Sequence, residues 1–523
     1  MIKNQPLNLR VHHFLVSIIC GLMVLICLSF LNKLNAQTVN YWSWNFNTPS
    51  TLLAGAVVGG GSGPSSIYYN PALINFDNVA SLSISANIFS FQFFKINNIA
   101  GDGLDVSNIK FKIQPRFLSY VLPSKNKKLG MEFAFISPVT EDIEYTLQHF
   151  DEIDIIERME GLETYSGYLN YGRKYDDTWG GFGLSYEFSK RFYIGGSSFF
   201  SYKSLKYHNI RSASAFQESD SVYINQVLEP SYFAQNSFTE ELNYWDASMI
   251  FKFGLHFLSE NEQLSFGVNI TSPNIPIMGR ADVRKDYEKS DVFDNESDSF
   301  TPNEILIEHE ESVKTRIKTP FSVALGFQYL TKNKNNFFSL TVEYFHNIEQ
   351  YSIIETTDTN NKLPNYFDGL IGENDFLPYY FEARSVTNIA FGLKQYLTPT
   401  VYIFGGFRTD FSAAVEDNFR FSGNTFKVSQ LQLNKYHFTI GPVLTIKRSE
   451  VVTGIQYTFG GNKNFPNVIN YKNPVEYIPL TGQSLEGIRM NNASTSINEL
   501  SLFLGITVDL FKKKNDSEEE KQF

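Results

Sequence analysis

Cysteine and charge are both scarce in this sequence, and each scarcity excludes a class of protein. The only two cysteines, Cys20 and Cys27, lie near the N-terminus, so the rest of the chain can form neither a disulfide framework nor a thiolate metal site. Charged residues make up only 19% of the 523 residues, whereas aromatic residues reach 15%. Disordered chains show the opposite balance, which excludes intrinsic disorder.

Long apolar runs are also scarce beyond the first 36 residues. The mean hydropathy of -0.20 excludes a bundle of membrane helices, because each such helix needs about 20 apolar residues. Residues 1–36 have the order of an export signal: Lys3 and Arg10 precede an apolar run over 14–31, and Ala36 supplies the small residue of a cleavage site. The run is long enough to span a bilayer, so an uncleaved anchor is the alternative.

A basic surface is absent as well. The predicted signal contains three basic residues and no acidic residue, so its removal changes the formal net charge from -11 to -14. Nucleic-acid phosphates require a positive surface. The charge balance therefore argues against a nucleic-acid partner.

Apolar and polar side chains alternate along most of the chain after residue 77, most clearly over 499–510. The two faces of this run are Leu500, Leu502, Leu504, Ile506, Val508 and Leu510 on one side, and Glu499, Ser501, Gly505, Thr507 and Asp509 on the other. Only a strand, whose side chains repeat every two residues, separates these sets. A soluble β-sandwich also alternates, but the runs are long enough for membrane strands, which need about 9–11 residues.

Fourteen such runs are predicted, and turn-forming segments separate them. They lie near 78–96, 107–122, 129–147, 163–188, 192–212, 238–258, 263–276, 306–330, 336–354, 382–397, 400–414, 433–447, 450–460 and 496–511. Two of them are joined across Asp176-Asp177 and Pro320, since splitting both would give sixteen. Short connections alternate with long ones, as in barrels with short periplasmic turns and long external loops. The fold class is therefore all-β, a 14-stranded antiparallel transmembrane β-barrel of the bacterial outer membrane.

Residues 37–77 do not alternate, and they contain a glycine-rich stretch followed by Ser-Ile-Tyr-Tyr-Asn-Pro-Ala at 66–72. Such a segment cannot face lipid as a strand, because proline lacks a donor and glycine has no side chain. Irregular backbone at membrane depth is tolerated only inside protein or in a water-filled lumen. We therefore predict a hatch inside the barrel, with a periplasmic leader as the alternative. Its residues are Gly59, Gly60, Gly61, Gly63, Asn70, Pro71 and Ala72.

The predicted organisation has four parts. They are a signal peptide (1–36), an N-terminal hatch or plug (37–77), the transmembrane β-barrel (78–511) and a charged periplasmic tail (512–523). Many barrels end with their last strand, so the tail is unusual.

The segment 66–72, directly before the first predicted strand, resembles the N-terminal hatch of the FadL-type outer-membrane transporters. A second likeness is the run 319–329, which enters a strand through Pro320 and ends in Gly-x-x-Tyr. The resemblance implies a fourteen-stranded barrel that takes up hydrophobic compounds, such as long-chain fatty acids, passively. It also implies capture at external loops, a movable hatch and exit through a gap in the wall. Leu73-Ile74 departs from the family, in which glycine commonly follows Asn-Pro-Ala.

Two groups of residues are candidate ligand contacts inside the barrel. Trp42, Trp44 and Phe46 make the N-terminal segment unusually apolar, so they would line an acyl-chain pocket or pack on the inner wall. Lys112 and Arg116 belong to a row of inward polar residues over 110–116. These cations would meet a carboxylate head group or pair with acids on neighbouring strands.

A third group lies in the predicted external loop 150–162. Phe150, Ile153 and Ile156 are spaced by three, which predicts one face of a short helix. Such a face could form a capture groove for the hydrophobic compound, or pack against neighbouring loops.

No catalytic or metal-binding motif is found. No pair of histidines has the His-Glu-x-x-His spacing, and Gly-x-Ser-x-Gly is absent. The acidic run 291–298 lacks the glycine and the terminal glutamate of a calcium loop. The sequence thus predicts no enzyme, no cofactor and no metal.

Three functions remain open. The first is a FadL-like channel whose partner is a hydrophobic small molecule or fatty acid, in contact with outer-membrane lipid. The second is a partner barrel of a protein secretion system, similar to the PorV-type proteins. The third is a general porin, which a plugged lumen disfavours.

Overall fold

A computed structural model describes residues 39–43, 48–76, 80–219, 221–333, 336–356, 376–415, 426–428 and 431–510. The predicted signal peptide, Trp44, Phe46 and the predicted tail lie outside the described residues.

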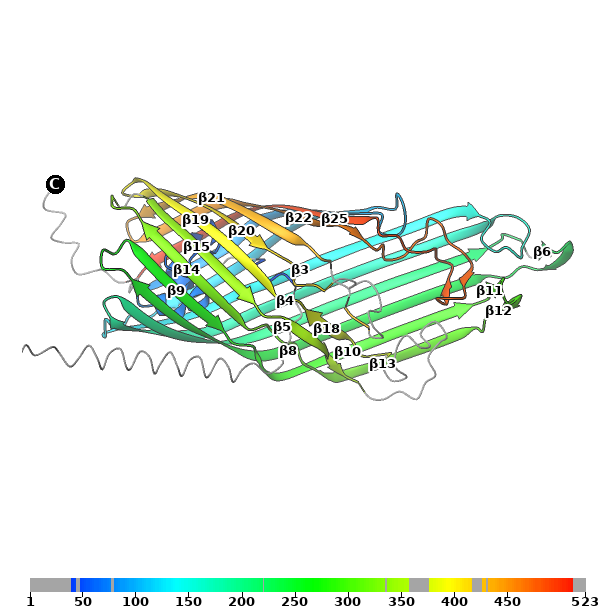
Figure 1. The fold of residues 1–523 in the computed structure, drawn as a ribbon, viewed down its shortest axis with the longest axis horizontal. Helices are drawn as coiled ribbons and strands as arrows, with labels where there is room; N and C mark the ends of the chain where they lie inside the picture. Colours follow the sequence, from blue (N-terminus) through cyan, green and yellow to red (C-terminus); the bar gives the residue numbers. More distant parts are fainter. Residues whose placement is uncertain are drawn as a thin grey trace, which may run out of the picture.

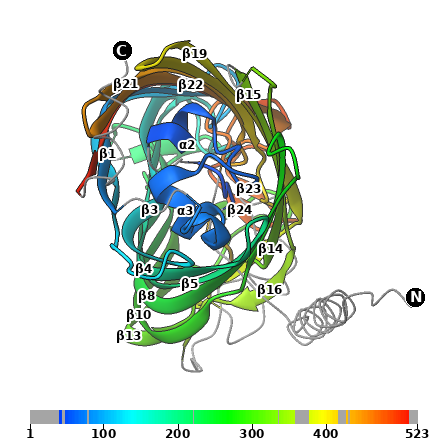
Figure 2. The same ribbon diagram turned by 90° about the vertical axis from the view of Figure 1, so that its left-hand side faces the viewer.

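The described strands form a closed antiparallel barrel that crosses the membrane fourteen times (Figures 1 and 2). Twelve crossings are single strands. These are β1 (Ser81–Asn97), β2 (Val106–Val121), β3 (Leu129–Ile153), β4 (Glu163–Ser189), β5 (Phe192–Phe216), β8 (Ala234–Leu258), β15 (Asn336–Phe345), β19 (Val386–Thr398), β20 (Val401–Asp410), β21 (Asn434–Ile446), β22 (Ser449–Phe465) and β25 (Ala493–Asp509). Pairing of β1 with both β2 and β25 closes the barrel.

Two crossings are each interrupted once, and both interruptions contain a proline. β9 (Leu264–Thr271) continues as β10 (Ile275–Ser290) after Pro273, and β13 (Glu304–Thr315) continues as β14 (Ser322–Leu330) after Pro320. Proline has no amide proton for the ladder, which explains the breaks. The prediction of fourteen strands, with one crossing joined across Pro320, is confirmed.

Short two-stranded antiparallel sheets lie in the connections between the described strands. They are β6 (Ser221–Ile224) with β7 (Val227–Pro230), β11 (Phe293–Asp294) with β12 (Ser299–Phe300), β16 (Ile348–Ser352) with β18 (Tyr380–Ala383), and β23 (Tyr477–Ile478) with β24 (Gln483–Ser484). β17 (Ile354–Glu355) adds two residue pairs to β13.

The alternation of side chains explains why this barrel lies in a membrane. Along β25 the outward Leu500, Leu502 and Leu504 are exposed, whereas the inward Ser501 and Thr507 are buried. A wall with apolar residues outside and polar residues inside is the pattern of a transmembrane barrel. The architecture agrees with the predicted location in the bacterial outer membrane.

The apolar band covers only part of the longest strands. On β8 it runs from Phe257 to Trp245, and the outward residues Asn243 and Glu241 that follow are polar. Twelve residue steps of about 3.3 Å on a strand tilted by about 40° span roughly 30 Å, close to the usual apolar band of about 25 Å. The remaining part of β8 therefore rises beyond the lipid. We call the corresponding parts of β3, β4, β5, β8, β10 and β13 the outer extension (Figure 1).

The outer extension corrects two predictions from the sequence. The seventh crossing was predicted to end at residue 276, but β10 continues to Ser290. The short helix predicted within 150–162 is wrong, because β3 continues to Ile153. Both errors have one cause: above the lipid the outward residues face water, so the strand loses the apolar face by which it was recognised.

The N-terminal segment lies inside the barrel (Figure 2). Residues 48–76, called the luminal segment below, contain the helices α2 (Thr48–Leu52) and α3 (Ser66–Tyr69) and the 3-10 turns η1 (Gly63–Ser65) and η2 (Pro71–Leu73). No described helix is long and apolar enough to cross a membrane.

Candidate functional site

The luminal segment is seated where the barrel wall has no side chains. Gly267 on β9 and Gly326 on β14 are direct cross-strand partners. A Cβ atom at Gly267 would lie 1.9 Å from the carbonyl oxygen of Val58, and one at Gly326 would lie 2.1 Å from the amide nitrogen of Gly59. Backbone therefore packs directly on backbone here, which only glycine in the wall permits. This contribution of the wall was not predicted from the sequence, although both glycines stand at inward positions of predicted strands.

Asn70 joins the luminal segment to itself and to the wall. Its buried amide nitrogen Nδ2 donates to the carbonyl oxygen of Val58 at 2.9 Å and to that of Leu255 at 3.0 Å. Its Oδ1 accepts a hydrogen bond from the amide of Ala72 at 3.1 Å, so Asn70 caps the turn that begins at Pro71. The Asn-Pro-Ala motif thus has a structural reason: the side chain satisfies three backbone groups at once.

The predicted hatch glycines share one tight loop. Gly60, Gly61 and Gly63 have φ values of 148°, 78° and 53°, which side chains rarely adopt. Gly59 lies against the backbone of Gly326 and Phe327. These glycines allow the loop to turn in the space next to the wall, and their role in a moving hatch stays a prediction.

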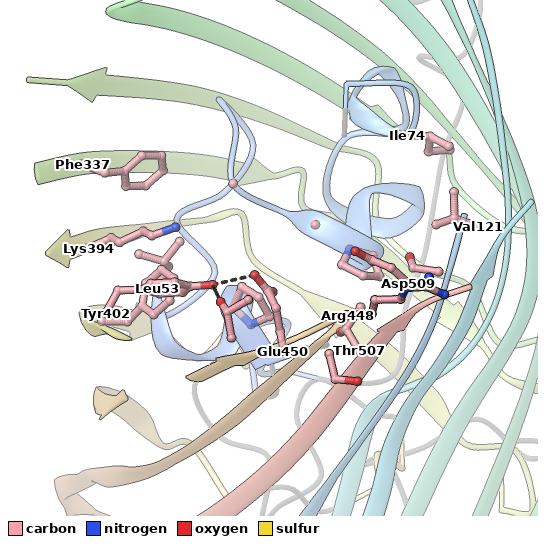
Figure 3. Close-up of a pocket in the computed structure, with 18 of the residues that line it drawn as sticks. Leu53, Ile74, Val121, Phe337, Lys394, Tyr402, Arg448, Glu450, Thr507 and Asp509 are labelled. Atoms are coloured by element: carbon pink, nitrogen blue, oxygen red, sulfur yellow. Dashed lines mark hydrogen bonds between the residues drawn. The ribbon is translucent and has the colours of Figure 1, made fainter. Parts of the chain in front are cut away.

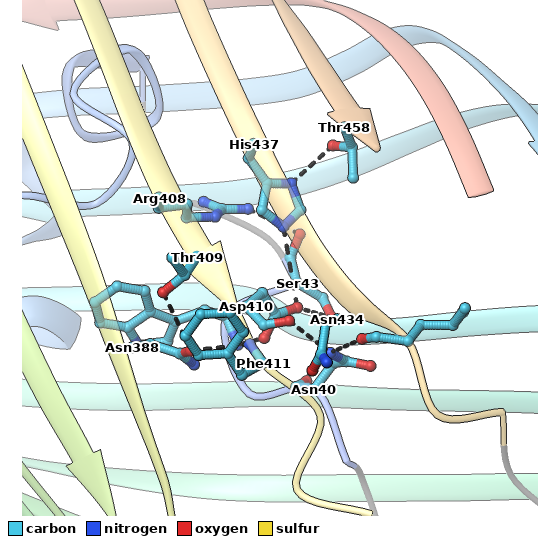
Figure 4. A network of polar contacts seen from close by, with 12 residues as sticks. Asn40, Ser43, Asn388, Arg408, Thr409, Asp410, Phe411, Asn434, His437 and Thr458 are labelled. Atoms are coloured by element: carbon cyan, nitrogen blue, oxygen red, sulfur yellow. Dashed lines mark hydrogen bonds and ion pairs between the residues drawn. The ribbon is translucent and has the colours of Figure 1, made fainter. Parts of the chain in front are cut away.

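A second contact holds residues 40–43, which we call the strap, against β20 (Figure 4). The backbone amide of Trp42 donates to Asp410 Oδ1 at 3.0 Å, and the hydroxyl of Ser43 donates to Asp410 Oδ2 at 3.3 Å. Arg408 Nη2 donates to the carbonyl oxygen of Ser43 at 3.0 Å, and Asn40 Nδ2 donates to the carbonyl oxygen of Asp410 at 3.0 Å. Arg408 and Asp410 are fully buried, so the strap depends on charged groups removed from water.

Polar groups of the barrel wall contact the side chain of Trp42. The indole Nε1 of Trp42 donates to Glu343 Oε2 at 2.7 Å, and Glu343 Oε1 accepts a hydrogen bond from Ser322 at 2.6 Å. Tyr41 packs on Phe345 with ring centroids 4.7 Å apart. The acyl-chain pocket predicted around Trp42 stays a prediction, and the described part of this segment contacts the inner wall.

A cavity of about 370 Å³ opens beside the luminal segment at the end of the barrel that carries the short turns (Figure 3). Leu53 and Phe337 supply apolar surface. The Lys394 ammonium lies 4.3 Å from the ring centroid of Tyr402, whose hydroxyl donates to Glu450 at 2.6 Å. The cavity is thus mixed in character, apolar on the side of the luminal segment and charged on the side of the turns.

The wall is discontinuous between β2 and β3. These strands are paired only from Phe117 opposite Ile136 to Val121 opposite Glu132. Beyond this short ladder β2 extends back to Val106 and β3 extends on to Ile153 without backbone pairing between them. The pairing ends next to Pro138, where the register of β3 against β4 also shifts. We call this break the seam.

Polar side chains cross the seam. Lys110 forms an ion pair with Asp142, and Asn108 Nδ2 donates to the carbonyl oxygen of Glu144 at 2.9 Å. Arg116, which is buried, lies 3.4 Å from the hydroxyl of Thr140. The inward row 110–116 therefore lines the seam. For Lys110 the structure shows the alternative stated for this row, pairing with an acid on a neighbouring strand. Ligand contact by Lys112 and Arg116 stays a prediction.

The residues predicted as an external capture face do not share a face. Phe150 points outward and is 65% exposed, whereas Ile156 is fully buried. The amides of Ile155 and Ile156 donate to Glu163, which ties this loop into the outer extension. Ile153 packs against the same buried cluster as Ile156. Residues 150–153 form a strand rather than a helix, so Phe150 does not lie on the same face as Ile153 and Ile156.

No cluster suited to a metal ion is found among the described residues. No family model matches this sequence, and no curated protein matches it. Among solved structures, a Pseudomonas aeruginosa FadL homologue matches over 92% of this chain and 100% of its own, with a TM-score of 0.54 and 12% sequence identity. The toluene transporters TodX of P. putida and TbuX of Ralstonia pickettii align with TM-scores of 0.49 and 0.48, each at 10% identity, over 92% and 89% of this chain and 100% and 99% of their own.

The match to the P. aeruginosa FadL homologue shows that the fold is that of a FadL-type outer-membrane barrel. The resemblance noted from the sequence is therefore confirmed at the level of the fold.

Proposed function

We propose that this protein is an outer-membrane channel for the passive uptake of hydrophobic compounds, such as long-chain fatty acids. In this proposal, external loops capture the compound, and a movable hatch formed by the luminal segment controls its release. Two observations support it: the lumen contains the luminal segment at membrane level, and the wall has a seam. A polar solute needs a continuous wet passage, whereas an apolar compound can leave sideways into lipid.

The seam is the observation that carries the proposal. Beyond Phe117 and Ile136 no backbone ladder joins β2 to β3, and side chains join the two strands there instead. A shorter gap of this kind lies between residues 272–279 and 315–321, where Asn274 bonds to Thr319 and Ile317. Side chains can move apart without breaking a ladder. The outward residues beside the seam are apolar, among them Ile113 and Phe135, both 63% exposed. A compound that passed the seam would therefore enter the hydrocarbon layer directly.

Charge at the seam suits an amphiphile with an acidic head group. Lys112 and Arg116 line the inner side of β2, and a carboxylate would gain charge-assisted hydrogen bonds from such cations. The acyl chain would contribute about 0.8 kcal/mol for each buried methylene. A fatty acid combines both requirements better than a neutral sugar or an ion does.

Closing the seam with a cross-link tests the proposal. Lys110→Cys and Asp142→Cys place two thiols where side chains already touch across the seam. Bridging them with a short bismaleimide should reduce the uptake of a fluorescent fatty acid at least tenfold. The matched control is Ser166→Cys with Ser214→Cys, a cross-strand pair in the continuous ladder of β4 and β5, where bridging should change nothing. Unchanged uptake through the bridged seam would contradict the exit route.

Binding of an amphiphile tests the same proposal at the strap. The purified protein should retain detergent or fatty acid in its lumen, and Trp42→Ala with Trp44→Ala should weaken that binding. If the protein instead retained no amphiphile and co-purified with a secreted protein, a secretion-partner function would replace this one.

A further inference from the structure

The outward surface of the barrel changes from apolar to charged at a single level. Tyr202 on β5 and Trp245 on β8 stack at this level, with ring centroids 6.3 Å apart and planes inclined by 19°. Below them the outward residues are apolar, for example Phe200 and Phe253. Aromatic girdles of this kind mark the boundary between hydrocarbon and lipid head groups. The residues directly above the pair therefore face the head groups of the outer leaflet.

Four exposed cations stand at this boundary, and we call them the basic belt. They are Lys174 on β4, Lys206 on β5, Arg280 on β10 and Lys314 on β13. Lys174 is the direct cross-strand partner of Lys206, and Arg280 is that of Lys314. β8 lies between the two pairs and presents Asn243 opposite Lys206.

Like charges directly opposite each other destabilise a sheet. Two such pairs in one belt are therefore a cost unless an anion compensates them. Natural strands more often place opposite charges at these positions, so the arrangement points to a negative ligand supplied from outside the chain.

Among the four cations of the belt, only Lys314 has an acidic partner, Glu355, which it shares with Arg316. Asp142 lies opposite Lys174 but is paired with Lys110 across the seam, and Asp282 accepts the amide of Ser312. Asp176 shares the outward face of β4 with Lys174. Within the described residues, Lys174, Lys206 and Arg280 form no ion pair at 4.0 Å or less.

We propose that the basic belt binds the phosphate groups of the anionic glycolipid in the outer leaflet. Phosphates of this lipid lie at the level of the aromatic girdle, where the belt stands. The Arg280 guanidinium can hold a phosphate with two parallel hydrogen bonds, and the lysines add charge on flexible stems. A lipid with two phosphates fits the two like-charged pairs. This site does not depend on the compound that the barrel transports.

The proposal is tested with bis-phosphorylated lipid A as the probe and the full-length barrel in non-ionic detergent. The variant Lys174→Gln, Lys206→Gln and Arg280→Gln should bind the lipid at least tenfold more weakly, as measured by native mass spectrometry. The control variant Lys128→Gln with Lys190→Gln removes two exposed lysines at the opposite, short-turn end. It should bind like the wild type. Heat-dependent mobility on a gel verifies that each variant is folded.

A second arm uses only the wild-type protein, so it does not depend on folding of the variants. Lipid A from which the phosphates have been removed should bind at least tenfold more weakly than the intact lipid. Inorganic phosphate at millimolar concentration should not displace the intact lipid. Equal binding of both lipids, equal loss in the control variant, or full displacement by inorganic phosphate would overturn the proposal.

Discussion

The interior of this barrel is filled in two different ways at two levels. At membrane level the wall presents glycine, such as Gly267 and Gly326, and the backbone of the luminal segment lies directly against it. In the outer extension the wall presents tyrosine instead. Tyr145 stacks on Tyr171 at 4.9 Å, and Tyr171 contacts Tyr207 at 6.0 Å, both measured between ring centroids. The wall therefore has small residues where another segment packs against it, and large ones where its own side chains fill the interior.

This difference shows how one β-sheet can be stable with one part in lipid and the other in water. The part in lipid has its apolar residues outside and must be filled from within by a separate segment. The part in water buries its aromatic residues inside, as a soluble protein does. Loops complete this inner packing: Lys285 on β10 donates to the carbonyl oxygen of Phe376 at 2.7 Å and lies 3.4 Å from the ring centroid of Phe426.

The largest expected effect concerns the side of the outer membrane on which the outer extension lies. A protease site placed within Asp291–Asp298, in the long connection after β10, should be cut on intact cells. A site placed within Lys125–Lys128, in the short turn after β2, should be cut only after the outer membrane is opened. Cleavage in the reverse pattern would show that the outer extension points into the periplasm.

Removal of the luminal segment should affect the membrane part of the barrel but not the outer extension. Deletion of residues 37–70 should leave a folded barrel whose ion conductance in a planar bilayer rises at least tenfold. The reason is that nothing then fills the lumen at the level of the wall glycines. The outer extension should keep its protease resistance, since its own tyrosines fill it. Unchanged conductance would mean that the segment does not block the lumen.

Substitution of the wall glycines should raise the ion conductance less than the deletion does. In the variant Gly267→Ala with Gly326→Ala, each new methyl group meets the backbone of residues 58 and 59 at about 2 Å. Overpacking of this kind costs about 1–3 kcal/mol, so conductance should rise severalfold and the luminal segment should become more accessible to protease. Gly196→Ala is the control, because its Cβ atom would find the nearest atom at 3.7 Å. An effect as large in the control would point to general barrel strain.

The smallest effect is a pH dependence confined to the external loops. Glu476 is buried beside Phe293, whose amide donates to it at 2.8 Å, and burial raises the pKa of its carboxyl to about 7. The pKa of the folded state lies above the ordinary value of 4.5, because burial disfavours the charged carboxylate more than the Phe293 hydrogen bond favours it. The folded loop is therefore most stable below pH 4.5, and this stabilisation is lost as pH rises through 7.

Hydrogen exchange measures this loss. The Phe293 amide should exchange faster at pH 8 than at pH 5 after correction for the intrinsic rate, whereas amides of β25 should not change. Glu476→Gln should remove the difference, because glutamine stays neutral at both values. A pH response that persists in this variant would assign the effect to another group.

The sequence predicted the barrel better than it predicted the candidate functional site. The number of crossings, the luminal location of a segment around Asn70-Pro71 and the outward apolar faces all depend on local patterns. Pro138, inside a predicted strand, was a readable signal for the seam, because proline cannot donate to a ladder. The strap was not readable, since Asp410 and Arg408 meet Ser43 only after the barrel has closed.

By itself, the sequence determined which residues alternate, where the turns lie and which segment cannot face lipid, because these properties follow from neighbouring residues along one chain. Only the tertiary structure decided that Gly267 and Gly326 seat Val58 and Gly59, and that Lys174 stands opposite Lys206. Such contacts depend on the register between strands and on how far the wall rises out of the lipid. Both are set by closure of the whole barrel, which no local pattern contains.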